Sequence, residues 1–228
     1  MPQKSNAGLI RLGILALPLA GLLALVGPLG DLVSPDPEVN PRGAAQATST
    51  TTYFLSQFVG NVLAITLLIF GFLALFAYLV NTRGGRLTSL ALVLSISGLC
   101  MFLSFVGIPA YVFPALAQEY LNGQENALQM VESIFSGNLF AIIILGGLLQ
   151  FIGFVLFGLA IWRSETLPKW AGVLLAISGL ILAVPTYLPA LNLLGIILLI
   201  IAGGWTALTV WRQPYGLRER GEAHPRVR

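Results

Sequence analysis

Amide side chains are the residues of this sequence best placed to do chemistry, because they recur at similar positions in its apolar segments. Asn61, Asn138 and Asn192 each lie near the same end of a long apolar run, and Gln57 and Gln150 lie in or beside such runs. Amides donate and accept hydrogen bonds without carrying charge. One interpretation is therefore a polar cluster lining an outward-facing pocket. The other is interhelical hydrogen bonding or helix capping near a membrane surface, which we favour because asparagine is a common cap.

The groups that most enzyme chemistry requires are missing from the apolar runs. No Asp, Glu, Lys, Arg or His lies in the middle of any run, and the only histidine is His224. Intramembrane ionisable groups usually mark proton relays and ion pathways, so the pattern argues against a pump, a voltage sensor or a proton-coupled carrier. A His/Cys metal site within one chain and a Ser–His–Asp triad are also excluded. We expect no enzyme activity, no catalytic residue, no metal and no cofactor.

The composition predicts a membrane protein. Hydrophobic residues make up 57% of the 228 residues and charged residues only 9%, whereas a soluble domain carries about a quarter charged residues. So few charges cannot cover a surface that faces water. The net charge of +3 comes from basic residues at the ends of apolar runs, which indicates membrane topology rather than nucleic-acid binding. Cys100 is the only cysteine and lies within an apolar run, so we expect it to be a packing residue.

The elements that must position the amides are six apolar segments. They lie near residues 9–30, 54–80, 88–112, 137–161, 169–187 and 190–211. A membrane-spanning helix needs about 20 apolar residues, and helices satisfy their own backbone hydrogen bonds in lipid. The sequence therefore predicts an all-α, polytopic transmembrane helix bundle with six spans. It forms one domain, residues 1–211, followed by a basic cytoplasmic tail, residues 212–228.

The charges predict the orientation of this bundle. If the N-terminus lies in the cytoplasm, every lysine and arginine except Arg42 falls on the inner side, and most acidic residues fall outside. This agrees with the positive-inside rule. The first segment is too long, and too far from Ala45-Gln46-Ala47, for a cleaved signal peptide. We expect a multi-pass protein of the cell inner (cytoplasmic) membrane with both termini in the cytoplasm.

The connecting segments differ in character. Residues 31–53 contain three prolines and then a run of hydroxyl residues, which predicts an extended, poorly ordered loop. Residues 114–136 mix apolar and polar residues and predict a surface helix or a helical extension, broken at Asn122-Gly123. Residues 185–189 predict a tight turn between the last two spans. A re-entrant pair is the alternative there.

The sequence also repeats itself. Residues 58–65 resemble residues 135–142, and residues 92–99 resemble residues 173–180, in the same order. Spans two and three would then be one copy of a hairpin, and spans four and five a second copy in parallel orientation. Parallel repeats occur in transporters, but duplication also produces bundles that transport nothing.

The segment from Gly153 to Leu175 contains the turn Arg163-Ser164-Glu165-Thr166-Leu167-Pro168-Lys169. It resembles the C-terminal half of an uncharacterised bacterial family with a six-helix membrane domain of unknown function. The resemblance implies a six-helix bacterial membrane protein and transfers no catalytic or binding residue. It covers about a quarter of the chain.

Three functions follow in order of preference. The first is a non-enzymatic structural, accessory or interaction protein, embedded in the lipid bilayer, with a protein partner or a second copy of itself as its neighbour in the membrane. The alternative is an uncoupled small-molecule or lipid pathway that uses Asn61, Asn138 and Asn192. A membrane enzyme is third. A dry, dense bundle would favour the first function, and a continuous polar cavity that reaches the asparagines would favour the second.

Overall fold

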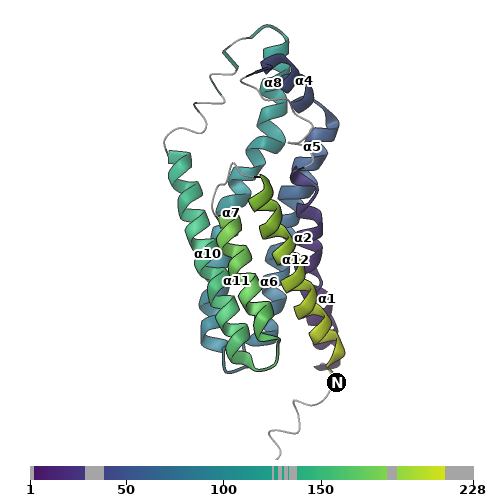
Figure 1. Ribbon diagram of the computed structural model, residues 1–228, viewed down its shortest axis with the longest axis vertical. Coiled ribbons are helices and arrows are strands. Elements are labelled where there is room, and N and C mark those ends of the chain that lie inside the picture. Colours follow the sequence, from purple (N-terminus) through teal and green to yellow (C-terminus); the bar gives the residue numbers. More distant parts are fainter. Residues whose placement is uncertain are drawn as a thin grey trace, which may run out of the picture.

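The protein is an elongated bundle of helices. The computed structural model describes residues 3–28, 39–124, 126–127, 130, 133, 138–183 and 189–213, and these contain helices and no strand. Figure 1 shows the long helices running side by side, with α4 and α8 at one end and the start of α1 at the other. We call these ends the α8 end and the N-terminal end. The elements are α1 (Gln3–Ile14), α2 (Ala16–Ala24), α4 (Pro41–Thr48), α5 (Thr51–Gln57), the π-helix η1 (Phe58–Leu63), α6 (Ala64–Leu79), α7 (Gly85–Gly107), the π-helix η2 (Ile108–Val112), α8 (Phe113–Leu121), α10 (Asn138–Ser164), α11 (Lys169–Ala183) and α12 (Pro189–Arg212).

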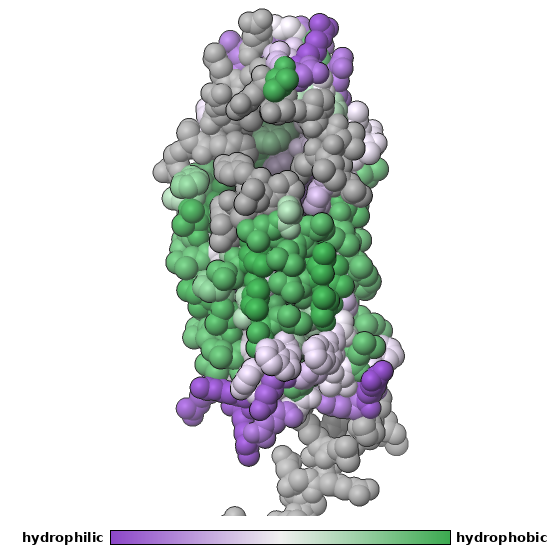
Figure 2. Space-filling model, in the orientation of Figure 1, coloured by the Kyte–Doolittle hydropathy of each residue, from purple (hydrophilic) through white to green (hydrophobic). Residues whose placement is uncertain are grey.

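Four helices of the described chain are long and apolar enough to cross a membrane. They are Thr51–Leu79, Gly85–Leu121, Leu139–Ser164 and Ala190–Arg212. Two shorter apolar helices, Gly8–Ala24 and Lys169–Ala183, run beside them. In Figure 2 a broad hydrophobic band covers the visible face, with hydrophilic residues towards both ends. The prediction of an all-helical protein is thus confirmed for the described residues, and four of its helices are long and apolar enough to cross a membrane.

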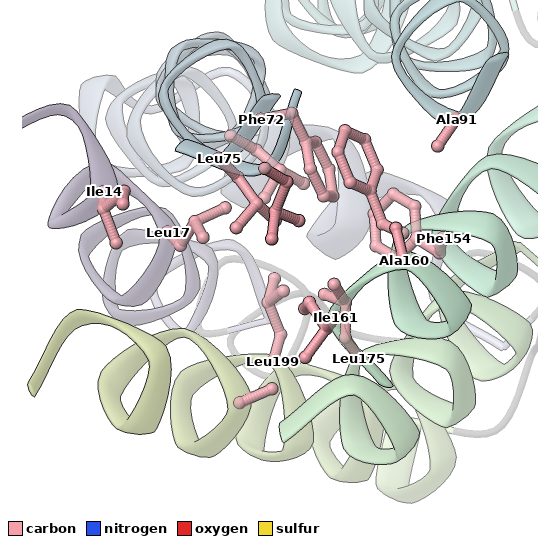
Figure 3. Packing of buried hydrophobic residues seen from close by; sticks show 14 of the residues in the cluster. Ile14, Leu17, Phe72, Leu75, Ala91, Phe154, Ala160, Ile161, Leu175 and Leu199 are labelled. Atoms are coloured by element: carbon pink, nitrogen blue, oxygen red, sulfur yellow. The ribbon is translucent and has the colours of Figure 1, made fainter. Parts of the chain in front are cut away.

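The helices form a closed ring around the core. Each packs on the next in the order α2, α6, α7, α10, α11 and α12, and α12 returns to α2. Towards the N-terminal end, α6 and α10 also meet inside the ring, where Phe72 stacks on Phe157 with ring centroids 4.7 Å apart. Phe154 meets the edge of Phe72 at 4.8 Å. Figure 3 shows Phe72 and Phe154 converging with aliphatic residues from the neighbouring helices. This half of the bundle is therefore densely packed.

Small residues set the close crossing of α7 and α10. A Cβ atom added to Gly98 of α7 would lie 2.5 Å from the backbone nitrogen of Gln150 in α10. A Cβ added to Gly153 of α10 would lie 2.5 Å from the nitrogen of Ser95. Small residues allow such close backbone approach between membrane helices. The crossing fixes where Gln150 stands relative to α7.

The prediction of an extended loop over residues 31–53 is wrong for its second part. Helix α4 begins at Pro41, and α5 begins at Thr51. The side chain of Asn40 accepts a hydrogen bond from the Gly43 nitrogen at 2.9 Å, and Thr50 accepts one from the Tyr53 nitrogen at 3.2 Å. Proline suits the first helical position, and asparagine and threonine suit the cap. The residues that suggested a loop are therefore the signals that start two helices.

The prediction of a helical extension after span three is confirmed. The helix that begins at Gly85 continues through η2 and α8 to Leu121. It ends at Asn122-Gly123, as expected, with Gly123 at φ +95°. Glycine adopts this left-handed conformation without steric cost, which is why it commonly ends helices. The predicted turn at residues 185–189 and the basic tail beyond residue 213 lie outside the described residues, Pro189 apart.

Candidate ligand-binding cavity

A cavity of about 480 Å³ lies inside the ring, in the half of the bundle nearest the α8 end. All the helices of the ring contribute to its wall, each through the part that lies towards this end. Representative lining residues are Ala20 of α2, Leu68 of α6, Phe102 of α7, Ile143 of α10, Leu182 of α11 and Ile196 of α12. The wall is therefore mostly apolar and partly aromatic.

Three amides are the polar side chains of this wall. They are Asn61 of η1, Gln150 of α10 and Asn192 of α12. Among the described residues that line the cavity, none carries a charge. The site can therefore exchange neutral hydrogen bonds with a ligand, and it offers no ion pair.

The π-helix η1 positions Asn61. A π-helix contains one wider turn, and such turns are frequent at functional sites. The Nδ2 atom of Asn61 donates a hydrogen bond to Oε1 of the buried Gln57 at 2.6 Å. Gly60 lies directly against the backbone after α2, because a Cβ there would be 2.1 Å from the nitrogen of Gly27. Asn61 is thus held at the wall both by its neighbour and by helix packing.

Gln150 is the most deeply buried of the three amides. Its residue is 5% exposed, and it makes no hydrogen bond to any described residue. The half-buried Asn192 also lacks a hydrogen bond within the described part of the chain. Leaving a buried polar group unpaired costs about 1–3 kcal/mol. Among the described residues, Ser95 Oγ is the one fully enclosed side-chain polar atom without a partner. The amide atoms of Gln150 are therefore accessible from the cavity, where water or a ligand can supply their hydrogen bonds.

The predicted polar cluster can be compared with these positions. The structure brings Asn61 and Asn192 to one cavity, together with Gln150, whereas Gln57 lies behind Asn61. Asn138 is the first residue of α10, but its side chain lies outside the described part. The one hydrogen bond seen here joins two residues of the same helical segment rather than two helices. Whether the three asparagines act together remains a prediction.

Sequence reasoning missed the aromatic part of the wall. Phe102, Phe105 and Phe140 line the cavity from α7 and α10. Apolar helices contain many phenylalanines, and the sequence carries no signal that distinguishes those facing a cavity from those facing lipid. The rotation of each helix within the ring decides this.

The cavity is closed towards the N-terminal end by two layers. The first is the aromatic core of Phe72, Phe154 and Phe157. The second consists of hydrogen bonds at the helix ends, where the Tyr78 hydroxyl donates to Oε1 of Gln213 at 2.6 Å and Gln213 Nε2 donates to the carbonyl of Thr166 at 2.8 Å. The lining residues stop above this core, at Ala20, Leu68, Gln150 and Leu199, so the cavity does not extend to the N-terminal end.

The chemistry available at the cavity is binding. No group of three or more His, Cys, Asp or Glu residues that could hold a metal ion occurs among the described residues. Comparison of the chain with protein-family models, with curated proteins and with solved structures finds no match. The geometry of the cavity therefore has to support any functional conclusion by itself.

Proposed function

We propose that this is a non-enzymatic integral membrane protein that holds one lipid-like molecule in the cavity of its helix bundle. The observation that carries the proposal is the amide of Gln150, a buried residue at the wall of a largely apolar cavity that makes no hydrogen bond to a described residue. Ligand sites are typically concave, about 300–1,000 Å³ in volume, and apolar with a few placed polar groups. The cavity has all of these properties.

The proposal includes six spans in a bacterial inner membrane, with both termini in the cytoplasm. Supporting it, α1 and α2 together extend from Gln3 to Ala24, which corresponds to about 33 Å at 1.5 Å per residue and exceeds a hydrocarbon core of about 30 Å. The 15 residues of α11 are shorter, but this helix packs between α10 and α12. Arg42 lies at the α8 end in α4, whereas Arg83, Lys169 and Arg212 lie at the N-terminal end. The N-terminal end would thus face the cytoplasm.

Two features of the structure support two of the functions considered from the sequence. The dense aromatic half suits a structural or accessory protein, and the cavity suits a binding role. A membrane enzyme gains no support, because the cavity wall offers only amides and apolar groups. We therefore combine the accessory role and the binding role: the protein is an accessory protein that holds a lipid-like ligand in its cavity as part of its function.

A protein partner or a second copy of the chain would bind the outer surface of the ring. Co-purification in mild detergent tests this.

Filling the cavity tests the proposal directly. Ile196 lines the cavity and is 4% exposed, whereas the next residue, Ile197, is 40% exposed. We expect Ile196→Trp to occupy the cavity and Ile197→Trp to point towards lipid. The measurement is native mass spectrometry of the protein released from lipid nanodiscs, counting retained lipid molecules. The unchanged protein and Ile197→Trp should retain one lipid through extensive delipidation, and Ile196→Trp should lose it.

Equal retention by all three proteins would contradict the binding role. Size-exclusion chromatography and thermal unfolding show whether Ile196→Trp is folded. If it is not, Ala24→Phe places an aromatic ring in the same cavity from α2.

The uncoupled pathway remains the second candidate, because Asn61 and Asn192 line one cavity. A pathway would need both closing layers to open. The test is movement of a fluorescent lipid across liposomes that contain the purified protein. We expect lipid retention without faster movement. If the protein speeds lipid movement and the Ile196→Trp variant does not, the pathway is the correct function and the binding role is wrong.

A further inference from the structure

The polar groups of the cavity wall are uncharged, which bears on the charge of the ligand that it can hold. Its polar side chains are three neutral amides, and no charged side chain lines it within the described chain. Arg83 and Arg212 lie at the opposite end of the bundle from the cavity, and Arg42, in α4 at the α8 end, is exposed and does not line it. A charged headgroup brought inside would lose water without gaining an opposite charge, which is costly in an apolar site. The wall therefore favours an uncharged ligand.

Gln150 and Asn192 lie at different distances from the N-terminal end of the bundle. Gln150 lies about 21 Å along α10 from Ser164, and Asn192 lies about 30 Å along α12 from Arg212, at 1.5 Å per residue. Ser164 and Arg212 both end their helices at the N-terminal end. Gln150 is therefore the deeper amide, near the middle of the bundle, and Asn192 is close to the α8 end. A ligand that reaches Gln150 must carry a polar group into an apolar environment.

The chemistry of Gln150 indicates which polar group this is. A glutamine amide offers two N–H donors and a carbonyl acceptor. Because Gln150 makes no hydrogen bond to a described residue, both functions are available to a ligand. A hydroxyl group donates and accepts at the same time and so complements it. A carboxylate or phosphate would use only the N–H donors and would leave its own charge unpaired.

We infer that the cavity binds an uncharged, single-chain amphipathic lipid whose hydroxyl and ester carbonyl groups bind Gln150 and Asn192, with its chain against the apolar wall. This inference rests on the proposed function. The cavity of about 480 Å³ provides room for one chain rather than a complete two-chain phospholipid. The closed N-terminal end requires that the molecule enters and leaves from the α8 half.

Three matched probes test the inference on the full-length protein in nanodiscs. They are 1-monooleoylglycerol, the corresponding lysophosphatidic acid, which differs only by a phosphate, and 1-octadecene, which has no polar group. Native mass spectrometry titrations give the relative affinities. We expect monooleoylglycerol to bind at least tenfold more tightly than either of the other two.

Variants then test whether the Gln150 amide forms the hydrogen bonds to the ligand. Gln150→Leu should weaken monooleoylglycerol binding about tenfold and leave octadecene binding unchanged, because it removes hydrogen bonds and keeps an apolar wall. It should also raise the midpoint of thermal unfolding of the lipid-free protein, since an unpaired buried amide is lost. Gln46→Leu is the control, because Gln46 is an exposed amide on α4 away from the cavity. If Gln150→Leu does not fold, Asn192→Leu serves as the second variant.

The outcomes separate the two proposals. If lysophosphatidic acid binds as tightly as monooleoylglycerol, the inference of an uncharged ligand is overturned and the binding function stands. If neutral selectivity persists unchanged in both Gln150→Leu and Asn192→Leu, the assigned amides are wrong. If the folded protein binds none of the three probes, the proposed function fails as well.

Discussion

Individual side chains of the same type have different roles in this bundle, and Phe72 is the clearest case. Its ring packs between Phe157 and Phe154 and is completely buried, whereas Phe70, two residues earlier in α6, is 56% exposed. A buried ring contributes packing that a lipid-facing ring does not, because lipid chains fill the space next to the latter. The two residues therefore provide a matched pair.

We predict that Phe72→Ala lowers the free energy of unfolding by about 3 kcal/mol or more, which is typical of an aromatic residue truncated in a packed core. Phe70→Ala should cost less than about 1 kcal/mol, since most of its surface already faces outward. Chemical unfolding in detergent micelles, followed by tryptophan fluorescence, measures both. Equal losses would show that α6 does not present Phe72 to the core.

The amides show the same dependence on position. Asn61 and Gln150 line one cavity, yet only Asn61 has a hydrogen-bond partner among the described residues. From the sequence both appear as isolated polar residues within apolar runs. Asn61 has a partner because Gln57 lies one helical turn before it and accepts its hydrogen bond.

At the scale of the helices, small residues determine how closely neighbours pack. Gly203 and Gly204 are adjacent in α12, but a Cβ added to Gly203 would lie 2.9 Å from the nitrogen of Pro18 in α2. A Cβ added to Gly204 would meet nothing within 4 Å. Only the first of the two glycines is therefore required by the contact between α12 and α2.

We predict opposite effects of alanine at these two positions. Gly203→Ala should lower the midpoint of thermal unfolding, because α12 and α2 must move apart. Gly204→Ala should leave it unchanged or raise it, since alanine favours a helix over glycine by about 1 kcal/mol. Differential scanning fluorimetry in one detergent compares both with the unchanged protein. A loss of stability in Gly204→Ala alone would contradict the packing of these two helices.

Helix starts at the α8 end illustrate a limit of reading composition. The prolines and hydroxyl residues before span two predicted a loop, but Asn40, Pro41 and Thr50 begin helices α4 and α5. Their individual positions follow known capping rules. The error came from weighing the composition of the whole segment above the order of its residues.

For the whole molecule, the distribution of basic residues supports the proposed orientation in the membrane. The described basic residues gather at the N-terminal end, except Arg42. The proposed topology therefore places Asn81, between α6 and α7, in the cytoplasm, and Gln46 of α4 outside. Both residues are exposed. Cys100 is the only cysteine, and it is exposed rather than buried as expected from its apolar run. Replacing it with alanine provides a background for single-cysteine labelling.

In intact cells we predict that a membrane-impermeant maleimide labels Gln46→Cys and leaves Asn81→Cys unlabelled until the cells are opened. Both variants carry Cys100→Ala. Labelling of Asn81→Cys alone would mean the inverted orientation. Labelling of both variants in intact cells would place both positions on the outer side of the membrane. The proposed topology, which puts them on opposite sides, would then be wrong.

Much of the fold was predictable from the sequence. The long apolar runs, the helical extension to Leu121 and the break at Asn122-Gly123 all follow from local rules, because helix formation in lipid depends on length, apolarity and backbone hydrogen bonds within one segment. The six-span count and the repeated hairpin stay predictions. Of the candidate site, the sequence identified the amides and their distribution along the helices.

The tertiary structure alone decided that Asn61, Gln150 and Asn192 face one cavity and that Phe72 closes it from below. In a soluble protein the polar side of a helix would reveal its orientation. Here lipid is as apolar as the core, so nothing in a single apolar segment distinguishes its inward side from its outward side. The sequence by itself determined which segments are long apolar helices and which polar groups they carry. The packing of glycines against neighbouring backbones determined how those helices are rotated, and hence which amides share a site.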